Sequence, residues 1–458
     1  MIENDAFKLL LINLFHLNPD DIANILCTTF NKMMVLLVTL TDKHQACPYC
    51  GFTAPKIKEY VTKEITHSAL TTQKCIIKYR ARRYKCPCCG KTYYEFNPFV
   101  FKSQKISILT VHNILKDLKD FNETFTSVAR RYHVSPTSVS TIFDNHVDIG
   151  RNPLPEIINF DEVYAFKSEK SKYVCVLLDF KKQIPVDVLP NRKKEYLLNY
   201  FQKIPLEERK KVKYACSDMY EVYRDVVHKV FPEAKHLLDY FHLSQDFHKK
   251  MNEVRIKVMK GYKDDKASDE YYLLKKFNWL LFKNPEDEDK YGRLFDVERE
   301  RKYNSHFKSY MNYYDLRKKI LEINNDLTIC YSLKLELVDF YSKSTIDNAQ
   351  VNLEHLIRSC IDTNIEEMIA FSNNLINWKQ EIINSFTIVG TEYKVEADKG
   401  QVVVCNKKVN NAIIENRNKI IKCIKNNANG YTNWSRFRNR VMYVLDPNAT
   451  FSLEPREK

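Results

Sequence analysis

Glycine and proline are scarce in this sequence, with 8 and 15 residues among 458. Because these residues make most turns and flexible segments, long flexible linkers are not expected. Long apolar runs are also missing. The longest, residues 33–40, falls far short of the ~20 residues that cross a bilayer and predicts a buried strand or a short helix. The first residues, MIENDAFK, are acidic, unlike a signal peptide. We therefore expect a cytoplasmic protein with no membrane partner, in which disulfides are rare.

The remaining composition is that of a folded protein with an excess of positive charge. Hydrophobic residues make up 44% and charged residues 28%, which argues against disorder. The length suffices for about three domains. The net charge of +14 favours a polyanionic partner such as nucleic acid, although a lysine-rich proteome would give the same excess.

The 13 cysteines are expected to be buried thiols or metal ligands. Four of them form two knuckles, Cys47-x-x-Cys50 and Cys86-x-x-Cys89, each followed by glycine. A CxxC turn brings two thiolates to one Zn²⁺, and two such turns complete a closed site of the structural type. Cys88 could replace Cys89 as the fourth ligand. The sequence therefore predicts a zinc-ribbon module.

A basic strand between the knuckles interleaves cations with tyrosines. Residues 78–85 read Lys-Tyr-Arg-Ala-Arg-Arg-Tyr-Lys and include Arg80, Arg82 and Arg83. Such a strand suits contacts with DNA phosphates. An edge strand that is protected by charge would have the same pattern, so both interpretations stay open.

Residues 105–147 change to a helical pattern that is typical of a helix-turn-helix. Its second helix would begin with Ser135 as N-cap and Pro136 at the first helical position. His133 takes the turn position where glycine is usual, and histidine tolerates positive φ better than most residues. The side chains expected to point outward into a DNA groove are Thr137, Ser138, Ser140 and Thr141. A plain helical hairpin would show the same apolar spacing.

Short apolar strands replace this helical pattern after residue 155. Three strands, a helix, a strand, a helix and a strand are expected in turn, over residues 157–160, 173–178, 184–189, 194–202, 212–216, 220–230 and 235–238. This is the order of an α/β ribonuclease-H-like domain. Asp161 and Asp218 follow apolar strands, and carboxylates are the ligands that Mg²⁺ prefers. Two such cations could activate the nucleophile and the leaving oxygen of a phosphodiester.

From residue 248 the sequence is mostly helical and strongly charged, which predicts an all-α insertion into the α/β domain. A later helix carries Glu415, Asn418 and Lys422 on one face, which places a carboxylate beside an amide and a cation that can hold DNA. Aromatic residues and three arginines downstream suit contacts with a DNA strand, namely Arg436, Arg438 and Arg440. The expected layout is an N-terminal segment (1–45), a zinc-binding module (46–99), a helix-turn-helix domain (100–150), two parts of the α/β domain (155–247 and 397–445) around the insertion (248–396), and a tail (446–458).

Several motifs stand in a set order along the chain: FDE (160–162), SDMYEVYRDVV (217–227), FPEA (231–234), DYFH (239–242), ENRNKIIK (415–422) and NGYTNWSRFRNR (429–440). With the zinc knuckles and the helix-turn-helix, they resemble the ISL-three type of bacterial insertion-sequence transposase over nearly the whole chain. The resemblance implies a DDE transposase in which Asp161, Asp218 and Glu415 bind catalytic Mg²⁺ or Mn²⁺. It also implies a supporting role for Asp239 and His242.

By the same resemblance, the zinc module and the helix-turn-helix bind the double-stranded terminal inverted repeats of the element. The active site would then cut at the repeat and join the freed end to target DNA. Holding two ends together implies at least a dimer, associated with the nucleoid in the bacterial cytoplasm. The alternative is a domesticated regulator that binds DNA through its zinc and helix-turn-helix modules without cutting it. A structure-selective nuclease of the same fold would show no preference for inverted repeats.

Overall fold

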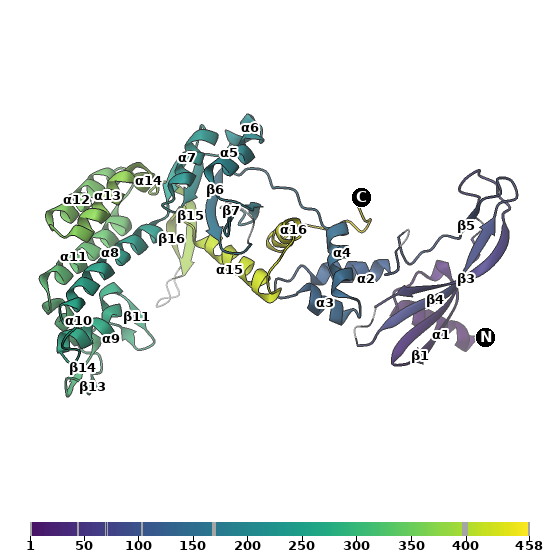
Figure 1. The fold of residues 1–458 in the computed structure, drawn as a ribbon, viewed down its shortest axis with the longest axis horizontal. Coiled ribbons are helices and arrows are strands. Elements are labelled where there is room, and N and C mark those ends of the chain that lie inside the picture. The colour runs from purple at the N-terminus through teal and green to yellow at the C-terminus, as the bar shows by residue number, and fades with distance from the viewer. Residues whose placement is uncertain are drawn as a thin grey trace.

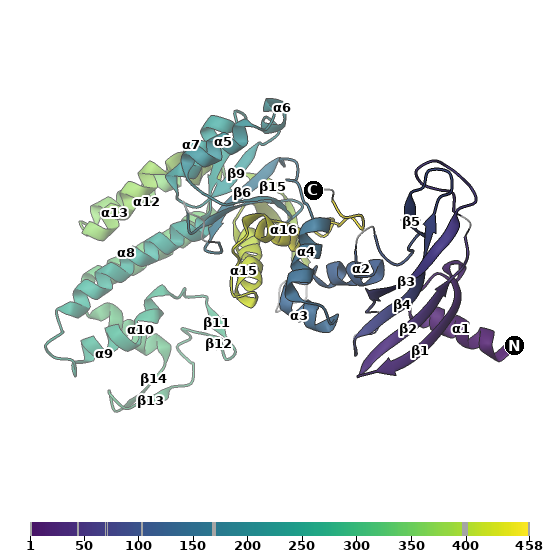
Figure 2. The ribbon, with the colours of Figure 1, turned by 45° about the vertical axis from the view of Figure 1, so that its right-hand side comes forward.

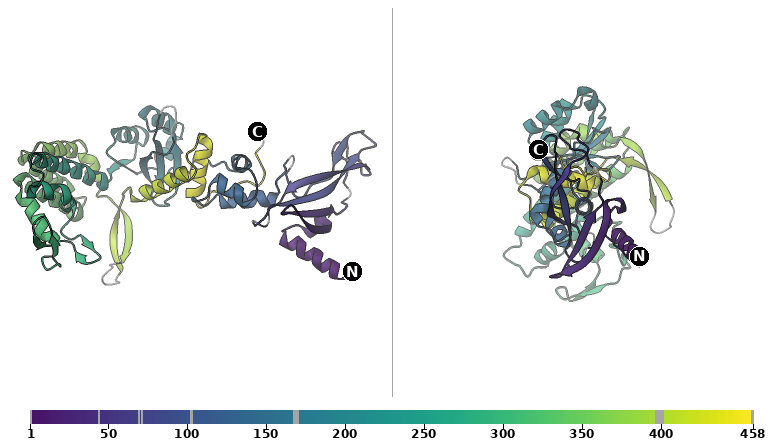
Figure 3. Two further views of the ribbon diagram at one scale, coloured as in Figure 1. Left: turned by 60° about the horizontal axis from the view of Figure 1, so that its bottom comes forward. Right: turned by 90° about the vertical axis from the view of Figure 1, so that its right-hand side faces the viewer.

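The structure, a computed structural model, describes residues 2–43, 45–68, 70, 72–101, 104–166, 171–395 and 402–456. The molecule is elongated, with an N-terminal β-sheet at one end, a bundle of helices at the other, and an α/β sheet between them (Figures 1 and 3). In the described ranges, no helix is both long and apolar enough to cross a membrane.

Five strands near the N-terminus form one sheet, next to helix α1 (Ile2–Leu14) and the short 3-10 helix η1 (Pro19–Asp21). The strands are β1 (Ile22–Phe30), β2 (Met33–Leu40), β3 (Lys56–Thr66), β4 (Cys75–Lys85) and β5 (Thr92–Tyr94). Their order is β1-β2-β4-β3, and β5 pairs with the end of β4. The apolar run at residues 33–40 is therefore a strand, as one of its two expected forms.

The pairing of β2 with β4 corrects two expectations. Leu36 of β2 and Ile77 of β4 lie opposite each other in a parallel ladder and enter the same core. This pairing makes one sheet of residues on both sides of the boundary expected at residue 45, so the zinc module is not separate from the segment before it. It also makes β4 a central strand between β2 and β3, which removes the edge-strand interpretation of its charges.

The helix-turn-helix pattern forms three helices, α2 (Ile108–Asp117), α3 (Phe125–Arg131) and α4 (Pro136–His146). The Ser135 side chain accepts a hydrogen bond from the backbone N–H of Ser138, so Ser135 is the N-cap of α4 as expected. His133 has a φ of +54°, which confirms that it takes the left-handed turn position. Buried side chains from all three helices, including Val128, Ala129 and Phe143, form the core.

The α/β sheet has the expected order of elements, apart from one additional short helix, α6. Its strands are β6 (Ile157–Val163), β7 (Val174–Asp179), β8 (Pro185–Leu189), β9 (Tyr214–Ser217) and β10 (Lys235–Leu238), and the helices between them are α5 (Lys194–Gln202), α6 (Leu206–Arg209) and α7 (Glu221–Val230). The spatial order is β10-β9-β6-β7-β8. β7 is antiparallel to β6 and β8, whereas β9 is parallel to both β6 and β10.

Side chains that alternate along the strands bury opposite faces of this sheet. Phe160 and Leu177 pack with α5 and α7, while Val174 and Val176 pack with the late helices α15 (Ala412–Asn427) and α16 (Trp434–Leu445). Figure 2 shows the two helical layers on either side of the strands. The C-terminal part of the chain therefore covers one face of a sheet whose first strand lies about 250 residues earlier. Asn159 of β6, for example, donates a hydrogen bond to Asn411, 252 positions away.

The insertion begins earlier than expected and is not all-α. Helix α8 (Tyr240–Lys260) starts directly after Asp239, and the helices that follow are α9 (Asp269–Lys276), η2 (Asn278–Phe282), α10 (Tyr313–Glu322), α11 (Asn325–Lys343), α12 (Ala349–Asp362), α13 (Glu366–Asn377) and α14 (Lys379–Asn384). Two small hairpins lie among them, β11 (Glu288–Asp289) with β12 (Gly292–Arg293) and β13 (Lys302–Asn304) with β14 (Ser309–Met311). Gly292, at a φ of +95°, makes the first turn possible. A longer hairpin, β15 (Ile388–Val395) with β16 (Val402–Lys408), leads into α15.

Candidate active site

Asp161 lies within β6, two residues before its end, rather than after the strand as expected. Its carboxylate accepts hydrogen bonds from the backbone N–H of Glu162 at 2.7 Å and from Nδ2 of Asn418 at 2.8 Å. Burial raises the pKa of Asp161 to about 7, and the nearby charge of Asp218 adds to the shift. Asn418 comes from α15, so the expected amide on that helix does meet the carboxylate on β6.

Glu162 is the other acidic residue of the FDE motif, and protein groups already bind its carboxylate. It forms an ion pair with Arg192, and its Oε2 accepts a hydrogen bond from the Tyr223 hydroxyl at 3.3 Å. Arg192 also stacks over the ring of Tyr220 at 4.8 Å. These partners distinguish the two acids, because Asp161 accepts a hydrogen bond from Asn418 of α15 whereas Glu162 pairs with Arg192.

Asp218 follows directly after β9, where the chain leaves the sheet toward α7. Burial raises its pKa to about 6, with a further contribution from the charge of Glu162. Its Oδ1 atom is buried and has no hydrogen-bond partner in the described part of the chain. A buried carboxylate oxygen without a partner costs free energy unless a cation satisfies it.

Asp239, His242 and Glu415 form a cluster beside these two aspartates. Asp239 follows β10, His242 lies in the first turn of α8, and Glu415 lies in the first turn of α15. One possible ligand atom from each of the three lies within 4.8 Å of the others. Asp239 Oδ2 and His242 Nε2 are 3.9 Å apart, and neither atom has a hydrogen-bond partner in the described ranges.

These side chains lie close together, because the backbone N–H of Asp239 donates to the carbonyl of Ser217, which precedes Asp218, and Asn418, one turn after Glu415, donates to Asp161. Burial raises the pKa of Asp239, and the charge of Glu415 adds to the shift. Within the described ranges, buried oxygen and nitrogen atoms without hydrogen-bond partners occur at Asp218, Asp239, His242 and Asn418. Carboxylates with unsatisfied oxygens suit hard divalent cations such as Mg²⁺ and Mn²⁺, so the donor set fits the expected metals.

The comparisons with known proteins concern this part of the chain directly. The model of the ISL3 transposase family, of the DDE type, matches residues 158–397, which is over half of the chain. The chain belongs to the ISL3 family of transposases. It is also similar to the transposase for insertion sequence element IS1001 of Bordetella parapertussis, at 19% identity over 412 residues that cover 89% of this chain and 91% of the relative. Asp161, Asp218, Asp239 and His242 lie inside the matched range of the family model, whereas Glu415 lies beyond it.

The four cysteines of the transposase's two knuckles meet at one point. Cys47 Sγ lies 3.7 Å from Cys89 Sγ, and Cys50 Sγ lies 3.5 Å from Cys86 Sγ. Gly51 and Gly90 have φ values of +74° and +70°, so each knuckle turns as its glycine predicts. Cys88 is exposed and lies outside this cluster, which favours Cys89 as the fourth ligand. The arrangement is compatible with one Zn²⁺.

The structure places the expected DNA-contacting residues of α4 differently from one another. Thr137 and Thr141 are exposed, and Ser138 is half-buried. Ser140 is buried and its hydroxyl donates to the carbonyl of Thr137 at 3.0 Å, so its expected outward position is wrong. Ser140 stands three residues before Phe143, which puts both on the inner side of the helix.

The arginines of α16 all bind other parts of the protein. Arg440 is 1% exposed and donates to the carbonyls of Asp120 and Glu123 at 2.8 and 2.7 Å. Its burial corrects the expectation that it contacts DNA. Arg436 pairs with Asp144 and Arg438 with Asp187, each at 2.6 Å, and both side chains stay partly exposed, so their contact with DNA remains a prediction. Local sequence could not show these partners, because they are distant along the chain.

The basic positions of β4 and α15 differ in how accessible they are. Arg80 is exposed and lies over the ring of Tyr60 at 4.9 Å. Arg82 pairs with Glu95 and Arg83 with Glu59, both at 2.7 Å. Lys422 is exposed, two turns along α15 from Glu415. Arg80 and Lys422 therefore stay accessible to a phosphate, whereas Arg82 already has a protein carboxylate.

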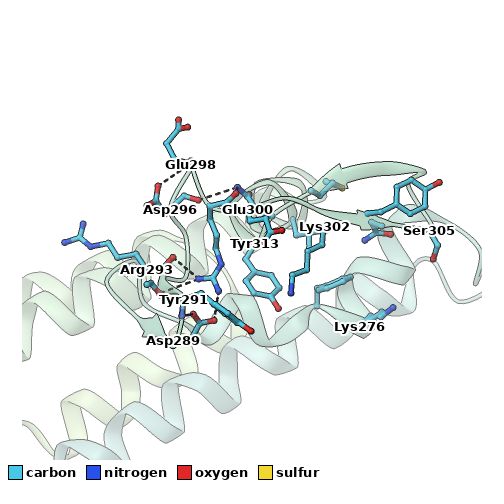
Figure 4. Close-up of a pocket in the computed structure, with 18 of the residues that line it drawn as sticks. Lys276, Asp289, Tyr291, Arg293, Asp296, Glu298, Glu300, Lys302, Ser305 and Tyr313 are labelled. Carbon is cyan, nitrogen blue, oxygen red and sulfur yellow. Dashed lines mark hydrogen bonds and ion pairs between the residues drawn. The ribbon is translucent and has the colours of Figure 1, made fainter. Parts of the chain in front are cut away.

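A cavity of about 770 Å³ lies in the insertion and is separate from the site carboxylates. Figure 4 shows tyrosines and charged side chains around it, among them Tyr291, Asp289 and Lys302. Arg299 pairs with Asp289 at 2.6 Å. Basic and acidic side chains line it in equal number: Lys276, Arg293, Arg299 and Lys302 against Asp289, Asp296, Glu298 and Glu300. This balance gives it no net attraction for an anion, so we assign it no part in the chemistry.

Sequence reasoning missed two residues that hold the site together. Arg192 pairs with Glu162, and Asn411 connects the start of α15 to β6 by accepting a hydrogen bond from Asn159 at 2.7 Å. A weak signal existed for Arg192, because the polar segment Asn191 to Lys194 follows an apolar strand that ends beside the site. Asn411 gave no local signal, since its partner is in a different part of the chain.

Proposed function

We propose that this chain is a DDE transposase that binds the terminal inverted repeats of its element and catalyses metal-dependent cleavage and strand transfer of DNA. The observation that carries the proposal is the convergence of carboxylates from β6, β9, β10 and α15, two of which, Asp218 and Asp239, have a buried oxygen without a hydrogen-bond partner in the described part of the chain. Asp161, Asp218 and Glu415 would hold two divalent cations, Mg²⁺ or Mn²⁺. When bound, these cations would activate the attacking hydroxyl and stabilise the leaving oxygen of the phosphodiester.

The neighbouring side chains have supporting roles in this proposal. Asn418 donates to Asp161 and so orients its other lone pairs toward the cations. Asp239 and His242 lie beside Glu415 and would help to hold or orient the groups that bind the cations. Lys422, exposed on the same helix, would hold a phosphate of the DNA strand. No side chain is required to form a covalent bond to DNA, because water and then the freed 3′-hydroxyl act as nucleophiles.

The N-terminal modules would provide recognition of the repeats. The Zn²⁺ of the cysteine cluster would hold the β3–β5 region of the sheet, where Arg80 is exposed, and α4 would present Thr137 and Thr141 to the major groove. Two transposon ends require two active sites, so we expect at least a dimer on double-stranded DNA, in association with the nucleoid. In this proposal the α/β domain consists of two parts of the chain on either side of the insertion, and the zinc module and the N-terminal segment form one unit.

Strand cleavage by Asp218→Asn tests the proposal. The substrate is a labelled duplex with the element's own end, incubated with Mg²⁺ or Mn²⁺, and the matched control is Asp225→Asn, whose carboxylate pairs with Lys194 at the surface. We expect nicking at the repeat boundary by the wild type and by Asp225→Asn, and a loss of about 10²–10³-fold in Asp218→Asn, on the order of the effect of removing a catalytic electrostatic group. Tight repeat binding with no cleavage by any of the three would instead support a domesticated regulator.

A further inference from the structure

A second cluster of metal-binding side chains lies where the insertion meets the α/β sheet. His236 is on β10, His228 is on α7, and Glu381 is on α14 of the insertion. Possible ligand atoms of the three lie within 4.8 Å of one another. Glu381 Oε1 is 3.9 Å from His236 Nδ1 and 4.0 Å from His228 Nε2. These distances are too long for hydrogen bonds.

The hydrogen bonds around His236 leave its Nδ1 atom available. The Ser217 hydroxyl lies 2.9 Å from the carbonyl of Asp218 and 2.9 Å from His236 Nε2. When this hydroxyl donates to the carbonyl, it accepts the proton of Nε2, and in that tautomer the Nδ1 atom of the neutral ring has a lone pair that can bind a metal ion.

His236 Nδ1 lies 3.9 Å from a carboxylate oxygen of Glu381 inside the protein. His236 is 1% exposed and Glu381 is 5% exposed, and Nδ1 has no hydrogen-bond partner in the described part of the chain. A cation between the two groups would bind the lone pair of Nδ1 and the carboxylate together.

We propose that His228, His236 and Glu381 bind a transition-metal ion of the Zn²⁺ type. Two imidazoles and one carboxylate are a common ligand set for Zn²⁺, and the fourth position would hold water. Bonds of about 2.0–2.2 Å to a tetrahedral ion require the ligand atoms to approach one another by roughly half an ångström. His228 has a side chain that is 57% exposed, so it can move to close the site and the ion can enter beside it.

The polar groups around the cluster support a metal at this position. His236 Nε2 lies 2.9 Å from the Ser217 hydroxyl, and a metal-binding histidine usually donates a hydrogen bond from its other nitrogen to a protein acceptor of this kind. The nearby cation Arg224 does not occupy the gap, because it lies over Trp378 at 4.3 Å and donates to the carbonyl of Asn377 at 2.9 Å. Asn384 also donates to the backbone carbonyl of His236 at 2.9 Å, which holds α14 against β10.

A metal here would fasten the insertion to the part of the sheet that carries two site aspartates. Ser217 immediately precedes Asp218, and β10 leads from His236 to Asp239 within three residues. The ion would therefore act as a structural clamp that positions these two carboxylates. The existence of the site does not depend on the proposed function, although its effect on cleavage would.

The zinc content of the full-length protein tests the site without an activity assay. After equilibration with micromolar Zn²⁺ and removal of free metal, the wild type should bind one zinc equivalent beyond that of the cysteine cluster. His228→Ala and Glu381→Gln should each lose that equivalent. His355→Ala is the matched control, since His355 is an exposed histidine with its Nδ1 2.9 Å from Glu336 in the insertion, and it should lose none.

Hydrogen exchange provides a second readout that a loss of folding would not imitate. Zn²⁺ should slow amide exchange in α14 and β10 of the wild type and of His355→Ala, and leave exchange unchanged there in His228→Ala. Equal zinc content in the wild type and His228→Ala would overturn the proposal, and so would a wild type that binds no zinc beyond the cysteine cluster. A His228→Ala protein that loses the zinc equivalent but keeps repeat cleavage would support the metal site and contradict its role in positioning the two carboxylates.

Discussion

The carboxylate of Asp161 accepts hydrogen bonds from the backbone N–H of Glu162 and from the side-chain amide of Asn418, whereas the carboxylate of Glu162 forms an ion pair with Arg192. At the scale of single residues, the two acids thus differ in their partners, because Asp161 accepts hydrogen bonds from uncharged groups whereas Glu162 pairs with an arginine. Asp161 and Asp218 keep their protons to higher pH than in an unfolded chain, because burial disfavours their charged forms.

These raised pKa values give a pH dependence with a definite sign. The folded protein without metal binds more protons than the unfolded chain between pH of about 4 and 7, so its stability falls as the pH rises through this range. Divalent cations need the ionised carboxylates, so stabilisation by Mg²⁺ should grow with pH over the same range. Thermal unfolding from pH 5 to 8 with and without Mg²⁺ measures this. An Mg²⁺ effect that is independent of pH, or that survives in Asp161→Asn, would contradict the assignment.

Arg440 is a residue for which burial decides the role. Replacing it by methionine removes the donors to the carbonyls of Asp120 and Glu123, and leaving such buried acceptors unpaired costs about 1–3 kcal/mol each. We expect Arg440→Met to lower the free energy of unfolding, measured in urea, by an amount of this order. Lys422→Met, at an exposed position, should leave stability unchanged. If Arg440→Met were as stable as wild type but bound DNA weakly, the earlier interpretation as a DNA contact would be right.

At the scale of elements, α4 shows how one helix divides its residues between core and surface. Val139, Ile142 and Phe143 enter the core of the helix-turn-helix, and Ser140 lies with them, which leaves Thr137 and Thr141 exposed. The outward surface of α4 is thus narrower than its polar sequence indicates.

This division predicts unequal effects of alanine on repeat binding. The double variant Thr137→Ala, Thr141→Ala should weaken binding to the terminal repeat by about tenfold, because two hydrogen bonds at roughly 0.5–1.5 kcal/mol each would be lost. Ser140→Ala should bind like wild type. Fluorescence anisotropy with a labelled repeat duplex at fixed salt compares them. Equal affinity for all three proteins would remove α4 from the recognition surface.

At the scale of the whole molecule, α16 joins the helix-turn-helix to the α/β domain. Tyr443 enters the core of the helix-turn-helix and donates to the carbonyl of Leu115 at 2.9 Å, whereas Val441 of the same helix packs with the sheet and α15. Lys119 of the helix-turn-helix region donates to the carbonyl of Asp446 at 2.8 Å. The helices α2, α3 and α4 are therefore held against the α/β domain by α16 and the residues that follow it.

Paired substitutions on α16 test this mechanical connection. Tyr443→Ala should speed amide exchange in α2 and α4, although both helices lie about 300 residues away in sequence, because it opens a cavity in their shared core. Val441→Ala should speed exchange in α15 and the sheet and leave α2 and α4 protected. Hydrogen-exchange mass spectrometry separates the two responses. Unchanged protection of α2 and α4 in Tyr443→Ala would mean that the helix-turn-helix folds without α16.

Sequence alone determined the elements whose signals are local. The alternation of apolar residues predicted β6 to β10 and their helices in order, the CxxCG pattern predicted the knuckles, and Ser135-Pro136 predicted the start of α4, because each depends on residues within about four positions. The resemblance to a transposase family indicated Asp161, Asp218 and Glu415 together, and the family is borne out by the matched range.

Only the tertiary structure decided which side chains are free and which are bound. The parallel pairing of β2 with β4, the burial of Arg440 beneath Asp120 and the contact of Asn418 with Asp161 join residues from about 40 to 320 positions apart. The type and spacing of a residue indicate which interactions its side chain can make. The partner that it finds depends on which distant segment of the chain packs against it. The arginines of α16, which were expected to contact DNA, therefore bind other parts of the protein. His228, His236 and Glu381 come from separate elements and lie close together, although no sequence motif indicated this.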